Sequence, residues 1–242
     1  MVGSNWKMPR ARVPKAPIKS LSDLIFGLAL SIGTISLIVG VPRTALDVAT
    51  DIAQFGFSFL ILIFVWLSYT SIMSVLPLED ETTIILNLLL LFLVSIEPYL
   101  FWLNATYASY VLKGAIGAGL LNIASIFYAI DMAGLMIILA LFTHQLTSEE
   151  KRLVPRELLR KYKFVRNTLL VSAGIFAITI LPIFWSVLII GTPIRFYVWF
   201  LPLSVSWLRR VNMHILMTVN DRPAKELALF TPDHRAIRAD YS

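Results

Sequence analysis

The sequence predicts an all-α integral membrane protein with six transmembrane helices in each chain. Hydrophobic residues make up 57% of the 242 positions and charged residues only 15%, which is too apolar for a water-soluble domain. The mean hydropathy of +0.77 agrees with this conclusion. The apolar residues are gathered into runs about as long as a bilayer-spanning helix, and most basic residues lie in segments that alternate with these runs.

Windows of about 19 residues divide the apolar sequence into six predicted spans. They cover residues 20–41, 52–76, 83–103, 112–142, 167–190 and 195–219. The fourth span is longer than a hydrocarbon core of about 30 Å requires, so we expect it to tilt, break or project beyond the membrane. Three spans contain an internal proline, which favours a kink: Pro98, Pro182 and Pro202.

The distribution of basic residues predicts the orientation of the chain. Of the 21 Lys and Arg residues, all but Arg43, Lys113 and Arg195 lie in the N-terminal segment, in the connection Lys151–Arg166 or towards the C-terminus. By the positive-inside rule both termini are cytoplasmic, in a cell membrane. The predicted organisation is a basic cytoplasmic N-terminus (residues 1–19), a six-helix transmembrane domain (20–219) and a polar cytoplasmic tail (220–242). We expect the basic face to contact anionic lipid.

Several classes of function lack the residues that they need. The chain has no cysteine, and its three histidines lie far apart without acidic neighbours at metal-ligand spacing. The motifs HExxH and GxSxG are absent, so we predict no enzyme activity and no cofactor. The net charge of +6 is accounted for by the segments that flank the membrane, so no nucleic-acid partner is expected. The proline-containing N-terminus does not resemble a cleaved secretory signal, and the first span is therefore expected to be retained.

The first span carries polar side chains on an otherwise apolar helix. Four of its residues are spaced four, three and four positions apart and so share one face: Leu24, Leu28, Ser31 and Ile35. A ring of such helices would place apolar constrictions at Leu28 and Ile35 around a hydroxyl layer at Ser31. The TVGYG filter of potassium channels is absent, so such a pore would be lined by side chains. A stripe of this kind is also typical of a helix that contacts lipid or neighbouring helices.

Three acidic residues lie within predicted spans, where a charge is costly and marks either function or a specific pairing: Asp23, Glu97 and Asp131. For Asp23, near a predicted helix start, we favour helix capping and interhelical packing over ion binding. Glu97 could reach an interface or a basic partner such as Lys113, and Asp131 is expected to be a buried hydrogen-bonding group. If Glu97 or Asp131 is titrated, the chain could instead be a proton-coupled or other small-solute transporter.

Three segments share the motifs of one known family. The first is Leu21-Ser22-Asp23 with the apolar run that follows it, which is similar to an Arg-x-x-x-Phe-Ser-Asp signature. The second runs from Phe55 to Met73 and includes Trp66, and the third runs from Leu86 to Tyr99 and includes Asn87 and Pro98. Together, over about residues 18–103, they resemble the transmembrane protein 175 family, the endolysosomal potassium channels and their bacterial and archaeal relatives.

The resemblance implies both an assembly and a set of pore residues. In that family, six helices form one repeat, single-repeat members are homotetramers, and the first helices surround the pore. Counted from Asp23, the family's two aliphatic constrictions fall on Leu28 and Ile35 and its hydroxyl layer on Ser31, where a potassium ion would bind transiently. Ser22, Asp23, Trp66, Asn87 and Pro98 are the matching signature and packing residues.

The chain also departs from the family pattern. Pro17 stands at the signature arginine and Leu21 at the signature phenylalanine, while Tyr69 and Ser71 replace a histidine and a basic residue of the second helix. The polar network that these groups form between helices must therefore be rebuilt or lost. The predicted function is a cation channel, preferring potassium as its permeant ion. The alternatives are the transporter above and a non-conducting membrane scaffold of the same fold.

Overall fold

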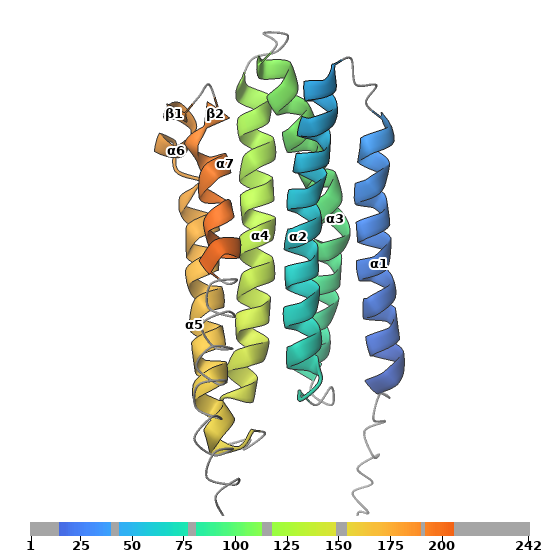
Figure 1. The fold of residues 1–242 in the computed structure, drawn as a ribbon. Helices are drawn as coiled ribbons and strands as arrows, with labels where there is room; N and C mark the ends of the chain where they lie inside the picture. Colours follow the sequence, from blue (N-terminus) through green and yellow to red (C-terminus); the bar gives the residue numbers. More distant parts are fainter. Residues whose placement is uncertain are drawn as a thin grey trace, which may run out of the picture. The chain divides into compact units, whose positions relative to one another are not determined.

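The computed structural model describes residues 15–39, 44–76, 81–112, 118–148, 154–189 and 192–205. The chain divides into two compact units, Met1–Leu201 and Pro202–Ser242. The first unit holds all the elements discussed below (Figure 1). The described part of the second unit is residues 202–205, which are helical.

Four long helices follow one another along the first unit. They are α1 (Lys15–Val39), α2 (Ala45–Met73), α3 (Glu81–Leu112) and α4 (Ala118–Leu146), of 25, 29, 32 and 29 residues. At about 1.5 Å per residue, each is longer than a hydrocarbon core of about 30 Å. Each also contains a window apolar enough to cross a membrane. The prediction of a mostly helical membrane protein is therefore confirmed.

The start of α2 has a local chemical cause. Thr44 precedes the helix, and its hydroxyl oxygen accepts a hydrogen bond from the Asp47 backbone N–H at 3.1 Å. The Asp47 carboxylate accepts one in return from the Thr44 N–H, also at 3.1 Å. This capping box pairs amides that the first turn would otherwise leave free, so the helix begins several residues before the predicted apolar span.

The predicted fifth span has the wrong limits. Helix α5 (Arg156–Ile178) begins within the predicted basic connection and ends before Pro182, rather than running from residue 167 to 190. Its first half is rich in basic residues, so a hydropathy window excludes that half even though it is helical. Pro182 has no N–H to donate to the Ile178 carbonyl, which favours the end of the helix at this point.

Short elements follow α5 in place of a continuous span. They are α6 (Ile183–Ser186), strands β1 (Leu188–Ile189) and β2 (Thr192–Pro193), and α7 (Ile194–Val198). The strands form an antiparallel hairpin in which Leu188 pairs with Pro193 and Ile189 with Thr192. An apolar helical stretch continues to Val205, and the rest of the predicted sixth span lies outside the described residues, as does the predicted tail.

Burial differs sharply between the long helices. Helix α4 packs against α2, α3 and α5, whereas α1 packs mainly against α2 and α3. Accordingly, 67% of the α4 span is buried but only 17% of the α1 span. Figure 1 shows α1 at one edge of the group of helices and α5 at the other. Most of the surface of α1 is thus left for lipid or for another chain.

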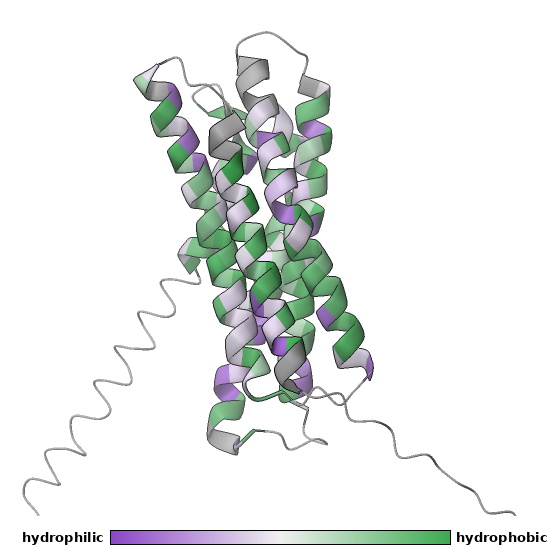
Figure 2. Cartoon of the chain, turned by 90° about the vertical axis from the view of Figure 1, so that its right-hand side faces the viewer, coloured by the Kyte–Doolittle hydropathy of each residue, from purple (hydrophilic) through white to green (hydrophobic). Residues whose placement is uncertain are grey.

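The outer surfaces of the long helices are apolar. Figure 2 shows hydrophobic positions along most of the length of these helices. Large exposed side chains occur on each of them, for example Leu28, Leu60, Phe92 and Phe127. A water-soluble monomer rarely exposes so much contiguous apolar surface, whereas a bilayer or a subunit interface covers it.

Candidate pore face and the polar network behind it

Helix α1 has two opposite faces. The buried face is formed by four residues at helical spacing: Ser22, Phe26, Ala29 and Gly33. The exposed face carries the predicted stripe: Leu24, Leu28, Ser31 and Ile35. At about 100° per residue, the centres of the two sets lie about 160° apart around the helix axis. The stripe therefore faces away from the core of its own chain.

The side chains of the stripe are apolar except at one level. Leu24, Leu28 and Ile35 are 68%, 57% and 54% exposed. Between Leu28 and Ile35, the Ser31 hydroxyl donates to the Gly27 carbonyl oxygen at 2.9 Å. Because the proton is used inside the helix, the oxygen lone pairs remain available to water or to a cation outside it.

A buried polar network lies behind this face and joins α1, α2 and α3. The Tyr69 hydroxyl lies 2.7 Å from Ser22 Oγ and donates to Asn87 Oδ1 at 2.7 Å. Ser22, Tyr69 and Asn87 are only 0%, 1% and 2% exposed. A polar network between these three helices is therefore present, and Tyr69 is its central member.

The hydroxyl protons of Tyr69 and Ser22 differ in the number of acceptors within reach. Tyr69 has one hydroxyl proton, and because this goes to Asn87, the Ser22 hydroxyl must be the donor in the Ser22–Tyr69 contact. The same Ser22 proton has a second acceptor, the Ile18 carbonyl oxygen at 2.9 Å. Ser22 can satisfy only one of them at a time, so it is the member of the network with a choice of partner.

Asp23 makes a separate contact between α1 and α2. Its Oδ1 accepts a hydrogen bond from Trp66 Nε1 at 3.1 Å, and the carboxylate is exposed. The expectation that Asp23 caps a helix is wrong, because α1 begins eight residues earlier, at Lys15. Its role in interhelical packing, and that of Trp66, follows directly from this hydrogen bond.

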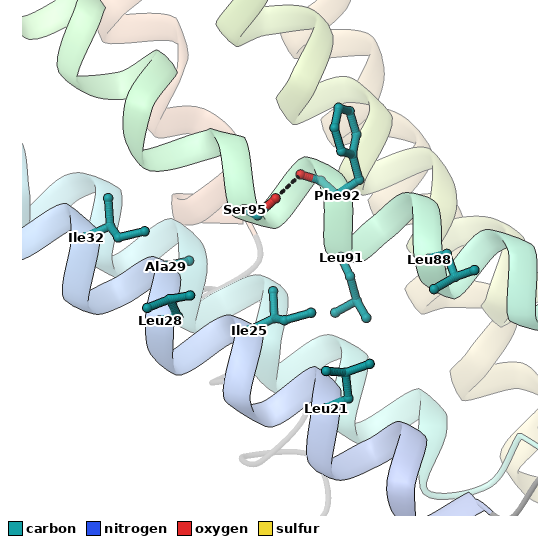
Figure 3. Close-up of a pocket in the computed structure, with 9 residues that line it drawn as sticks. All are labelled: Leu21, Ile25, Leu28, Ala29, Ile32, Leu88, Leu91, Phe92 and Ser95. Atoms are coloured by element: carbon teal, nitrogen blue, oxygen red, sulfur yellow. Dashed lines mark hydrogen bonds between the residues drawn. The ribbon is translucent and has the colours of Figure 1, made fainter.

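An apolar pocket lies beside the exposed face, between α1 and α3. Its volume is about 260 Å³, and Figure 3 shows its lining residues: Leu21, Ile25, Leu28, Ala29, Ile32, Leu88, Leu91, Phe92 and Ser95. Its one hydroxyl, on Ser95, donates to the Phe92 carbonyl oxygen at 2.7 Å. The pocket is suited to apolar groups, and Leu28 lies at the border between it and the exposed stripe.

Pro98, Glu97 and Asp131 lie apart from the α1 network. Pro98 follows Asn87 by eleven residues on α3, and the helix continues through it. Glu97 is fully buried and accepts a hydrogen bond from Ser58 on α2, so it reaches neither an interface nor the solvent. Asp131 is buried as expected, but neither carboxyl oxygen has a hydrogen-bond partner among the described residues.

Sequence reasoning missed most polar residues of the interior, including two near the buried acids. Ser58 and Tyr128 lie within apolar runs, where a single hydroxyl does not change the hydropathy pattern. The sequence does contain one signal for Ser58. This residue lies in the same apolar run as Trp66 and Tyr69, which were singled out. Only the helix packing shows that its hydroxyl meets Glu97, 39 residues later in the chain.

Comparisons with known proteins find a family and two solved structures that this chain resembles. Residues 18–98 match the family described as endosomal/lysosomal potassium channel TMEM175. A comparison with curated proteins finds no match. The crystal structure of a lysosomal potassium-selective channel TMEM175 homologue from Chamaesiphon minutus matches with a TM-score of 0.55 at 19% identity, covering 82% of this chain and 98% of that one.

A second solved structure gives the same result. It is a variant of the potassium channel MtTMEM175 in complex with a nanobody fusion protein, and it matches with a TM-score of 0.52 at 18% identity. The match covers 88% of this chain and 100% of that one. At these identities the structures establish a common fold. The resemblance to the transmembrane protein 175 family is therefore confirmed over residues 18–98, and the two solved structures share the fold over most of the chain.

Proposed function

We propose that the chain is one subunit of a homotetrameric cation channel that prefers potassium and is lined by the exposed face of α1. The observation that carries the proposal is the position of the stripe from Leu24 to Ile35. It lies opposite the buried face of α1, on the least buried of the long helices. The solved proteins of the same fold, which are described as potassium channels, support this assignment.

The spacing along α1 suits a side-chain pore. Leu28 and Ile35 are separated from Ser31 by about 4.5 Å and 6 Å along the helix axis. In a ring of four copies, the two aliphatic levels would exclude water while the hydroxyl level between them offers oxygen to a partly dehydrated ion. A potassium ion would bind transiently near Ser31. The apolar constrictions would thus set the energy barrier to ion passage, and the Ser31 hydroxyls would lower that barrier between the two constrictions.

The polar network has a supporting role in this proposal. The Ser22–Tyr69–Asn87 contacts and the Asp23–Trp66 bond fix the rotation of α1 against α2 and α3. A rotation of α1 would move Ser31 off the pore axis. The network thereby keeps the stripe directed at the neighbouring copies.

The proposed orientation places both termini in the cytoplasm. The first half of α5 carries exposed basic side chains, Arg160 and Lys161 among them. This end of α5 would lie at the cytoplasmic headgroup level and contact anionic lipid.

Truncation of the constriction tests the proposed function. Purified protein is reconstituted into liposomes, and potassium flux is compared between wild type, Leu28→Ala and Leu60→Ala. Leu60 lies on α2 and is 58% exposed, against 57% for Leu28, so the two variants remove the same groups from equally exposed positions. We expect a several-fold increase in flux for Leu28→Ala and no change for Leu60→Ala.

Other outcomes point to the alternatives. Equal flux in all three proteins, with the tetramer intact, would contradict the pore assignment. Tetramers without flux in any gradient would indicate a non-conducting scaffold. A flux that needs Glu97 or Asp131 but is indifferent to Leu28 would indicate a transporter.

A further inference from the structure

Two acidic side chains are buried at the same level of the helix bundle. Glu97 on α3 is 0% exposed and Asp131 on α4 is 2% exposed. The Thr83–Gln145 hydrogen bond at one end of these antiparallel helices fixes their register. Glu97 lies fourteen residues after Thr83, and Asp131 lies fourteen residues before Gln145. The two acids are therefore opposite one another.

A second contact gives the same register from the other end of the helices. The Ser125 hydroxyl on α4 donates to Asn104 Oδ1 on α3. Asn104 is seven residues beyond Glu97, and Ser125 is six residues before Asp131. This contact therefore also places Glu97 and Asp131 at the same level of α3 and α4.

Two hydroxyl groups complete the surroundings of the acid pair. Ser58 on α2 donates to the Glu97 carboxylate, with Oγ at 3.1 Å from Oε1 and 3.3 Å from Oε2. Tyr128, one turn before Asp131, is fully buried. Neither the Tyr128 hydroxyl nor the two Asp131 oxygens have a hydrogen-bond partner among the described residues.

Two ionised carboxylates cannot be accommodated at this level without compensation. A buried charge in a membrane protein needs a counter-charge or several hydrogen bonds, and two adjacent like charges raise the cost further. The one buried Lys or Arg side chain among the described residues is Arg195 of α7, which donates to Asn122 at 3.1 Å. Asn122 is nine residues before Asp131, about 14 Å along α4, so Arg195 cannot pair with the acids.

We propose that Glu97 and Asp131 form a proton-binding site and share one proton between their carboxyl groups. The ionised partner is Glu97, because it already accepts a hydrogen bond from Ser58. Asp131, which has no donor, carries the proton and donates it to Glu97. The Tyr128 hydroxyl is a further buried donor for which no acceptor is found among the described residues. This site lies away from the exposed face of α1, and its existence does not depend on the proposed channel function.

The donor set favours a proton over a metal ion. Hard cations such as Ca²⁺ and Mg²⁺ take six or more oxygen ligands, including water. This buried site offers two carboxyl groups and two hydroxyls. One proton removes half of the charge and needs only a donor and an acceptor, as in other carboxyl pairs that titrate as a unit.

Infrared difference spectroscopy of the full-length protein in lipid bilayers tests the site. At neutral pH we expect the carbonyl band of a protonated carboxyl group, shifted in D₂O. Asp131→Asn should remove this band. Glu97→Gln should shift its frequency, because the acceptor of the proton changes. Glu81→Gln, which alters an exposed acid on the same helix as Glu97, is the matched control and should leave the band unchanged.

The wild-type spectrum keeps the test valid even if an acid variant fails to fold. Absence of the protonated band in wild-type protein, or its persistence unchanged in folded Asp131→Asn, would overturn the proposal. Spectra are also recorded with sodium, potassium or a large organic cation as the only monovalent cation. A band that appears only when the small cations are removed would assign the site to a metal ion and overturn the proton assignment.

Discussion

Tyr69 is the residue at which α1, α2 and α3 are joined. Its ring packs against Phe26 with centroids 5.7 Å apart, and its hydroxyl reaches Ser22 and Asn87. An aromatic ring with a polar end fits this position because the ring fills apolar space while the hydroxyl pairs groups that lipid could not satisfy. Tyr69 thus links the buried face of α1 to both α2 and α3.

Removal of this hydroxyl should destabilise the protein. Tyr69→Phe keeps the ring contact with Phe26 but leaves Ser22 and Asn87 without their shared partner, which costs about 1–3 kcal/mol for a buried group. Thermal unfolding in detergent measures the effect. Tyr197→Phe is the control, because its hydroxyl donates to the Ile189 carbonyl oxygen at an exposed position. Equal losses in the two variants would mean that the buried network contributes no specific stability.

At the residue scale, the sequence points to individual side chains only where a motif exists, and their roles in a channel stay predictions. Ser22, Asp23, Trp66 and Asn87 were identified by resemblance, and all four take part in contacts between helices. The polar partner of Asn87 could not be predicted, because Tyr69 departs from the family pattern. The alignment of Glu97 with Asp131 was also inaccessible, since it depends on the register of helices whose acids are 34 residues apart.

At the scale of elements, α3 and α4 approach closely near the buried acids. A methyl group placed on Gly134 would lie 3.0 Å from Leu93 Cδ1, one turn away from Glu97. The absence of a side chain at Gly134 therefore permits the spacing of the two helices. Gly174, on α5, has no neighbouring atom within 4 Å of the same position.

The same bulky substitution should have different effects on stability at Gly134 and at Gly174. Gly134→Val should push α3 and α4 apart and cost about 1–3 kcal/mol, as overpacking does in other cores. Gly174→Val should be neutral or slightly stabilising, because glycine is a poor helix former. The midpoints of thermal unfolding compare the two variants. A loss at Gly174 as large as that at Gly134 would show that helix spacing is not the cause.

The sequence predicts the first four helices better than the elements that follow them, for a physical reason. The first four helices have apolar character along most of their length, so a window of about 19 residues finds them. Helix α5 has a charged first half, and α6 and the two strands are only two to four residues long, so a window of this length cannot resolve them. The apolar helical stretch Ile194–Val205 does fall within a predicted span, apart from its first residue. The basic sequence before residue 167 was read as a connection, although it forms the first turns of α5.

At the scale of the whole molecule, the least buried long helix is the one with the most regular apolar stripe. Helix α4 is surrounded by its own chain, whereas α1 uses one face for contacts and leaves the other free. A helix of this kind at the edge of a subunit is suited to assembly around an axis. The sequence predicted which residues share this face, and in the described part of the chain Leu24, Leu28 and Ile35 are all more than half exposed.

The central claim is that Ser31 faces a water-filled ion path, and a unique thiol tests it directly. The chain has no cysteine, so Ser31→Cys introduces the only thiol. Leu60→Cys serves as the control on an exposed apolar face of α2. In liposomes that contain either variant, a charged, water-soluble thiol reagent is added during measurement of potassium flux. The account predicts that the reagent modifies Ser31→Cys and blocks the flux, while Leu60→Cys continues to conduct. A Ser31→Cys protein that conducts potassium and is neither modified nor blocked would contradict it.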